Sequence, residues 1–110
     1  MKIEKKKKLT KEWFTKLQNI ICNNVEQLEK EYGSNIKFKR NRWKHGEFRI
    51  IKGEVIEKGG VAFSNVSGKF SKKFAKKIPG TNTSAYFWSS GISVVLHPKN
   101  PKIPAMHFNT

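Results

Sequence analysis

Aspartate is absent from this 110-residue chain, and cysteine occurs only once, as Cys22. A Ser-His-Asp triad therefore cannot form, and a single thiol allows neither an intramolecular disulfide nor a thiolate metal cluster. The sequence also lacks a P-loop, a GxGxxG turn, an HExxH helix and any apolar run long enough to span a bilayer. Nothing in it resembles a signal peptide. We therefore expect a cytoplasmic protein that has no membrane partner.

Arginine is scarce as well, although the chain is strongly basic. Lysine and arginine together number 23 against eight acidic residues, which gives a net charge of +15, yet the only arginines are Arg40, Arg42 and Arg49. Such a charge attracts polyanions, including nucleic acid, an anionic membrane or a polycarboxylate substrate. Specific reading of bases or phosphates usually relies on the arginine fork. Lysine dispersed along a chain is more typical of a solvated surface, so we expect no specific nucleic-acid partner.

The first third of the chain predicts a basic tail followed by one helix. Residues 1–9 carry five lysines without apolar periodicity, which is typical of a mobile tail. Apolar residues then recur in steps of three and four, which predicts a helix over residues 10–32. Thr10 is its candidate N-cap and Gly33 its candidate C′ residue. Cys22 falls beside the apolar stripe, where we expect an ordinary, partly exposed thiol.

Residues 36–110 are rich in strand signals separated by turn residues. The expected features are a hairpin at Lys52-Gly53, a second hairpin or bulge at Gly59-Gly60, a loop or short helix over 68–77, a turn at 79–82, and a strand over 92–96 that can be buried on both faces. One helix followed by several mostly antiparallel strands predicts the α+β class.

The candidates for chemistry are three histidines, His45, His97 and His107. Imidazole is suited both to binding a first-row metal and to proton transfer near neutral pH. His97 ends the apolar strand, and proline then recurs at every third position over residues 98–104, which favours an extended, stiff segment. This segment fixes the separation between His97 and His107. A lone histidine at a strand end is also commonly a structural hydrogen-bonding residue, so spacing alone leaves both roles open.

Residues 91–109 read GISVVLHPKNPKIPAMHFN. This segment resembles the signature of oxygen-dependent coproporphyrinogen III oxidases, roughly G-[IV]-S-x-V-x-H-P-x-N-P-x-[IV]-P-x-x-H-x-N, and every defining position is filled. The stretch GEVIEKGGV at residues 53–61 is similar to the family's G-x-V-[FI]-E-K-[AG]-G-V, and SNVSG follows in register at residues 64–68. With the upstream Trp43, the resemblance covers about residues 40–110, and the N-terminal helix is compatible with it.

The resemblance implies a fold, an activity and a set of site residues. Residues 1–110 would form one partial domain, part of a larger antiparallel sheet flanked by helices. The family converts coproporphyrinogen III to protoporphyrinogen IX in haem biosynthesis, by oxidative decarboxylation with molecular oxygen and without flavin or haem. The resemblance assigns substrate binding to Ser93, Asn109 and Thr110, ligation of a manganese-like divalent metal to His97, and proton donation to His107. Family members are homodimers, and their dimer-forming segment would lie beyond Thr110.

Three departures from the family pattern qualify this interpretation. Between Trp43 and Glu47 the family has a run of glycines where this chain has only KHG, Ala62 replaces a usual asparagine, and the family continues beyond Thr110. The first hypothesis is therefore a truncated oxidase fragment that is inactive alone. The second is a working enzyme completed by a separate chain. The third is a small basic protein that binds nucleic acid non-specifically, supported only by charge.

Overall fold

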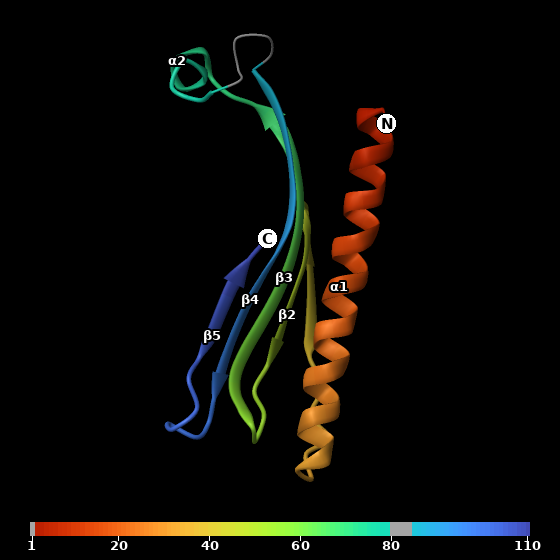
Figure 1. Cartoon of the computed structure of the whole chain (residues 1–110), viewed down its shortest axis with the longest axis vertical. Helices are drawn as coiled ribbons and strands as arrows, with labels where there is room; N and C mark the ends of the chain where they lie inside the picture. Colours follow the sequence, from red (N-terminus) through yellow and green to blue (C-terminus); the bar gives the residue numbers. More distant parts are fainter. Residues whose placement is uncertain (1, 80–84) are drawn as a thin grey trace.

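The computed structural model describes residues 2–79 and 85–110, in which a helix packs on one face of an antiparallel sheet (Figure 1). Within the described residues the sheet has five strands in the order β1-β2-β3-β4-β5. The elements are α1 (Ile3–Glu31), β1 (Lys39–Trp43), β2 (Gly46–Ile51), β3 (Ile56–Lys69), α2 (Lys72–Ala75), β4 (Tyr86–Pro98) and β5 (Met106–Asn109). The predicted α+β class and antiparallel order are confirmed.

The helix α1 begins seven residues earlier than the sequence predicted. Residues 3–9, expected to be a tail, form its first turns, because lysine is a good helix former and Glu4 in the first turn lies 3.5 Å from the Lys7 ammonium. The Thr10 hydroxyl does not cap the helix. It donates to the carbonyl of Lys6 at 2.7 Å, a bond inside the helix. The predicted boundary at Thr10 is therefore wrong.

The C-terminal end of α1 agrees with the prediction. Gly33 has a φ of +87°, the left-handed conformation that glycine adopts without strain. Its N–H donates to the carbonyl of Lys30 at 3.1 Å, and the N–H of Ser34 donates to the carbonyl of Glu29 at 2.9 Å. This pair of bonds is a Schellman motif, which satisfies carbonyls that the helix itself leaves without partners.

The side of α1 that meets the sheet is partly polar. Its buried residues are Gln18, Cys22, Val25 and Glu29, while the apolar stripe lies to one side, with Phe14, Leu17 and Ile21 packed against the core. The Gln18 amide donates to the carbonyls of Glu47 and Val61, at 2.9 and 3.1 Å. These hydrogen bonds favour a rotation of the helix in which polar side chains reach backbone groups of the sheet. Apolar periodicity alone does not predict this rotation.

Cys22 is buried, contrary to the expectation of a partly exposed thiol: it is 2% exposed and contacts the buried Arg49. Burial raises the pKa of Cys22, and its hydrogen bond with Arg49 offsets only part of that rise. The Arg49 guanidinium lies 2.7 Å from Glu47. Burial acts to raise the pKa of Glu47, but the hydrogen bond and charge of Arg49, with smaller help from Arg40 and Arg42, leave it lowered.

This burial predicts slow chemistry at Cys22. We expect a thiol reagent such as DTNB, at about pH 8, to label the folded chain at least 100-fold more slowly than the urea-unfolded chain, because the raised pKa reduces the thiolate and packing excludes the reagent. Labelling rates followed by absorbance measure the effect. Rates within a few-fold of each other would show that the thiol is accessible in the fold.

β2 and β3 form a hairpin, but its turn lies at Glu54-Val55 and not at the predicted Lys52-Gly53, since the Gly53 N–H donates to the carbonyl of Ile56 at 2.7 Å. Gly59-Gly60, however, forms neither a hairpin nor a bulge: both residues pair within β3, opposite Ile51 and Ile50. A side chain at Gly59 would collide with that of Ile51, so glycine allows close packing there. The register irregularity between β3 and β4 lies nearby, between Ile56 and Lys58. Most of the predicted turn at 79–82 lies outside the described residues.

The strands β3 and β4 are the longest, and they extend past their neighbours as a curved arm that carries α2 (Figure 1). The ring of Phe70 stacks on that of Phe87 with centroids 4.6 Å apart, and Phe74 lies 5.4 Å from Phe70. The short helix expected within 68–77 is thus confirmed.

The strand expected over 92–96 is buried on one face only, because α1 covers Ile92 and Val94 while Ser93 is exposed.

Candidate functional site

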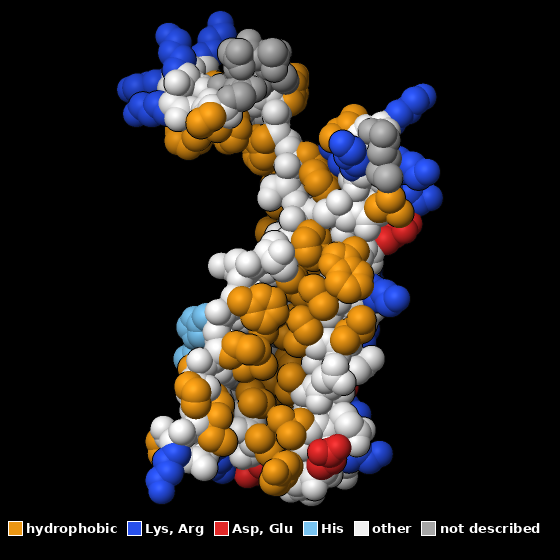
Figure 2. All heavy atoms as spheres, in the orientation of Figure 1, with side chains coloured by type: hydrophobic (Ala, Val, Ile, Leu, Met, Phe, Trp, Pro, Cys, Tyr) orange, Lys and Arg blue, Asp and Glu red, His pale blue; other side chains and the backbone are white. Residues whose placement is uncertain are grey.

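The sheet register places most of the predicted site residues on one face. Ser93 of β4 pairs with Asn109 of β5, and Val95 pairs with His107. Side chains alternate along a strand, so Ser93, His97, His107 and Asn109 share the face opposite to α1. Figure 2 shows the histidines on the side of the molecule away from α1. We call this surface the outer face.

The two histidines of the signature contact each other directly. Their Nε2 atoms are 2.9 Å apart, and the rings are nearly parallel, with 17° between their planes. The ring centroids are 5.1 Å apart, which exceeds the Nε2 separation by close to twice the radius of an imidazole ring. The rings therefore lie end to end in almost one plane. This is the geometry of an N–H···N hydrogen bond in which one ring donates and the other accepts.

Thr110 differs from the other predicted substrate residues. Its N–H donates to the carbonyl of Ile92 at 3.0 Å, and its own carbonyl accepts from the Ile92 N–H at 2.9 Å. This doubly bonded pair puts Thr110 opposite Ile92, whose side chain faces α1. The backbone of Thr110 thus anchors β5, while its side chain is directed away from the outer face.

His45, the third candidate, is remote from this pair. It lies in the two-residue turn between β1 and β2, where its ring packs edge-on against Trp43 with centroids 5.2 Å apart. Its carbonyl accepts the N–H of Asn65 at 2.7 Å. The turn is tight because only two residues separate Trp43 from Gly46. The family pattern has its run of glycines at this position.

Sequence reasoning missed the other residues that surround the site. The register adds Lys58 beside His97, and it places a strip of small residues between β2 and β5: Gly60, Ala62, Ser64, Gly91 and Ser93. Phe48 and Ile50 of β2 lie on the far side of this strip and are exposed. The alternation of residues 46–51 indicates that Phe48 and Ile50 share one face of a strand. Only the strand pairing shows that they border the strip of small residues on the outer face.

The residues of this chain do not by themselves fit a divalent metal. Among residues 2–79 and 85–110, no three side chains of histidine, cysteine, aspartate or glutamate converge. The Nε2 atom of His97 is directed at Nε2 of His107, 2.9 Å away, so a metal bound at this nitrogen would have to replace that hydrogen bond.

Comparisons with known proteins agree with the signature. The sequence model described as coproporphyrinogen III oxidase matches residues 9–110. The chain belongs to the coproporphyrinogen III oxidase family. An oxygen-dependent coproporphyrinogen-III oxidase of Rickettsia akari (strain Hartford) is 44% identical over 120 residues, which cover 100% of this chain and 43% of the relative. That of Rickettsia bellii (strain OSU 85-389) is 43% identical over 117 residues, covering 97% and 42%. The chain therefore spans less than half the length of these curated relatives.

The family assignment gives the histidine pair its context. Both histidines lie in the segment that carried the resemblance, and the fold brings them together although ten residues separate them in the chain. The pairing of β4 with β5 produces this contact. The prediction of family membership is thus confirmed, whereas the individual residue roles stay predictions.

Proposed function

We propose that this chain supplies the β4–β5 part of an oxygen-dependent coproporphyrinogen III oxidase site. The observation that supports this most strongly is the hydrogen-bonded pair His97–His107 on the same face as Ser93 and Asn109. The reaction would be the oxidative decarboxylation of two propionates of coproporphyrinogen III to vinyl groups, with molecular oxygen as the electron acceptor and without flavin or haem. A cytoplasmic location belongs to the same proposal.

The proposed roles follow from the functional groups. The Ser93 hydroxyl and the Asn109 amide, paired across β4 and β5, can both donate hydrogen bonds to a propionate carboxylate. His107 would deliver a proton from Nδ1, the ring nitrogen that His97 does not engage, and His97 would hold the ring of His107 in place through the bond between their Nε2 atoms. Lys58, beside His97, would contribute positive charge for a tetracarboxylate substrate.

The manganese-like divalent metal of the first interpretation would need ligands other than those described here, and no step of this proposal passes through it. Nothing in the comparisons favours the alternative of a non-specific nucleic-acid-binding protein. No helix among the described residues is long and apolar enough to cross a membrane.

We predict that the 110-residue chain alone does not oxidise coproporphyrinogen III. The reason is that its outer face provides the histidine pair without aspartate or a third ligand. Turnover is measured as protoporphyrin separated chromatographically from coproporphyrin after chemical oxidation of both porphyrinogens, and His107→Ala is the control for background. Turnover by the chain alone above that control would contradict the prediction.

The proposed function itself is tested by complementation. The portion of the Rickettsia akari oxidase that follows the matched region is supplied as a second chain. Activity that appears only with both chains, and that His107→Ala removes, is the expected result. Activity that persists with His107→Ala in the mixture would overturn the proposed role of the histidine pair.

A further inference from the structure

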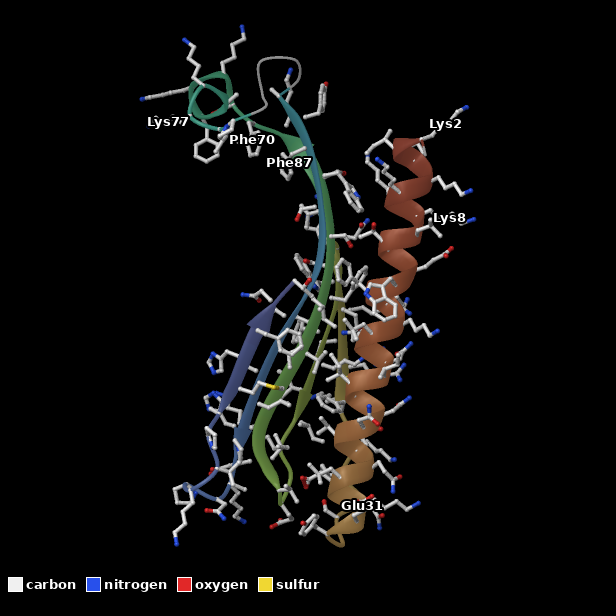
Figure 3. The ribbon with its side chains drawn as sticks, in the orientation of Figure 1. Lys2, Lys8, Glu31, Phe70, Lys77 and Phe87 are labelled. Atoms are coloured by element: carbon white, nitrogen blue, oxygen red, sulfur yellow. The ribbon has the colours of Figure 1, made fainter. Side chains whose placement is uncertain are left out.

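Half of the lysines gather at one end of the molecule, although the sequence had suggested that they were dispersed. The first turns of α1 and the tip of the β3–β4 arm lie at this same end (Figure 1). Figure 2 shows their lysine side chains as two groups on separate projections, and in Figure 3 the side chains of Lys2, Lys8 and Lys77 extend away from the molecule. We call this region the basic end; its lysines are Lys2, Lys5, Lys6, Lys7, Lys8, Lys69, Lys72, Lys73, Lys76 and Lys77.

The charge of the basic end is almost unopposed. The sequence contains no acidic residue after Glu57, so none lies on the tip of the arm. On α1, residues 3–11 contain one acid, Glu4, which pairs with Lys7 at 3.5 Å. Lysines this close repel one another within a Debye length of about 8 Å, and the repulsion is relieved when an anionic partner approaches.

Exposed apolar side chains accompany these lysines. Ile3 is 62% exposed, Phe74 is 49% exposed and Tyr86 is 71% exposed. Ile3 follows Lys2 and Phe74 follows Lys73 in the chain, and the Lys69 ammonium lies 5.3 Å from the ring centroid of Tyr86. Apolar and aromatic groups mixed with lysine are typical of segments that lie in the headgroup region of a bilayer. Unpaired bases would stack on the aromatic rings alone, whereas the bilayer interface also accepts the aliphatic side chain of Ile3.

The shape also favours a broad partner. The two projections are separated by a gap (Figure 2), so one partner contacts both only if it extends across the end of the molecule. A lipid surface does so without any specific fit. Clustered lysines suit such a surface, because the attraction of an ammonium group to anionic headgroups does not require the planar fork of arginine.

We propose that the basic end docks peripherally on an anionic lipid bilayer. Lysines from both projections contact the headgroups, and Ile3, Phe74 and Tyr86 enter the interface between them. The proposal replaces the expectation that the chain has no membrane partner. It involves no membrane-spanning segment and is independent of the proposed function.

The test is co-sedimentation of the full chain with phosphatidylcholine vesicles that contain roughly a third phosphatidylglycerol, and with pure phosphatidylcholine vesicles. We expect binding to the anionic vesicles only. Each lysine near an anionic surface strengthens binding by roughly fivefold, so Lys72→Gln, Lys73→Gln, Lys76→Gln and Lys77→Gln together should weaken it at least about tenfold.

A matched variant separates position from net charge. Lys30→Gln, Lys39→Gln, Lys52→Gln and Lys102→Gln remove the same charge from exposed lysines outside the basic end. This variant should keep binding within about threefold of the original chain. Equal losses in the two variants would overturn the proposal, since only the overall charge would then matter.

Two further measurements sharpen the outcome. Phe74→Ser should reduce the part of the vesicle binding that survives high salt, because that part depends on apolar insertion. Circular dichroism of each variant shows whether it folds. Tighter binding to single-stranded DNA than to the anionic vesicles, at equal phosphate concentration, would overturn the proposal in favour of a nucleic-acid partner.

Discussion

Replacing Glu29 with glutamine should remove much of the stability of this fold. The Glu29 side chain is fully buried at the end of α1, and its carboxylate accepts backbone N–H groups of Glu54, Val55 and Ile56 at distances of 2.6 to 3.0 Å. The carboxylate thereby holds the loop between β2 and β3 against the helix. Glutamine keeps one oxygen but turns an NH2 group toward the N–H donors that the other oxygen had accepted.

The expected loss is about 2–4 kcal/mol, since hydrogen bonds to a buried charge are the strong ones and their donors would lose their partners. In a domain of this size such a loss lowers Tm by more than about 10 °C. Thermal unfolding followed by circular dichroism measures it. Glu31→Gln, at an exposed position two residues further along the chain, is the matched control and should change Tm little. Similar Tm values for the two variants would show that the Glu29 carboxylate is not an anchor.

The second large effect is self-association driven by salt. Figure 2 shows hydrophobic side chains continuing from α1 across the neighbouring strands toward β5. The register places Phe108 of β5 opposite Val94, so both lie on the α1 side of the sheet, but α1 covers Val94 and leaves Phe108 exposed. An apolar face beside an exposed edge strand recruits other chains. At low salt the charge of +15 opposes this association.

Raising the salt concentration to about 0.5 M should therefore increase light scattering and make thermal unfolding depend on protein concentration. Phe108→Lys should reduce the scattering several-fold. Ile103→Lys is the control, because it adds the same charge at an exposed apolar residue in the loop between β4 and β5. A reversible, concentration-independent transition of a monomer at both salt concentrations would show that the chain is a self-sufficient domain.

The sequence predicted those features of the fold that local chemistry determines. Gly33 ends α1 because a left-handed residue must follow a helix that closes with a Schellman motif. The strand through Val94 follows in the same way from β-branched side chains, and a hairpin joins β2 to β3, although its turn lies two residues beyond the predicted Lys52-Gly53. The signature segment led to His97 and His107, although only as separate residues.

Features that depend on partners distant in the chain were not predictable from local patterns. The buried side of α1 is set by Gln18 and Glu29, whose acceptors and donors lie in strands and loops formed much later in the sequence. The same rotation buries Cys22. Spacing likewise gave no sign that the imidazoles of His97 and His107 share a hydrogen bond, because that contact depends on the register of β4 with β5.

Because His107 lies on β5, the position of the proposed proton donor depends on whether this single short strand stays paired with β4. β5 has four residues, all exposed, and among the described residues it pairs with β4 alone. Edge segments of this kind unfold locally at little cost while the rest of a domain stays intact. Each such opening separates His107 from His97 and releases its ring. A strand that joined the free side of β5 would slow this fraying, so that assembly of the sheet and readiness of the donor would become one event.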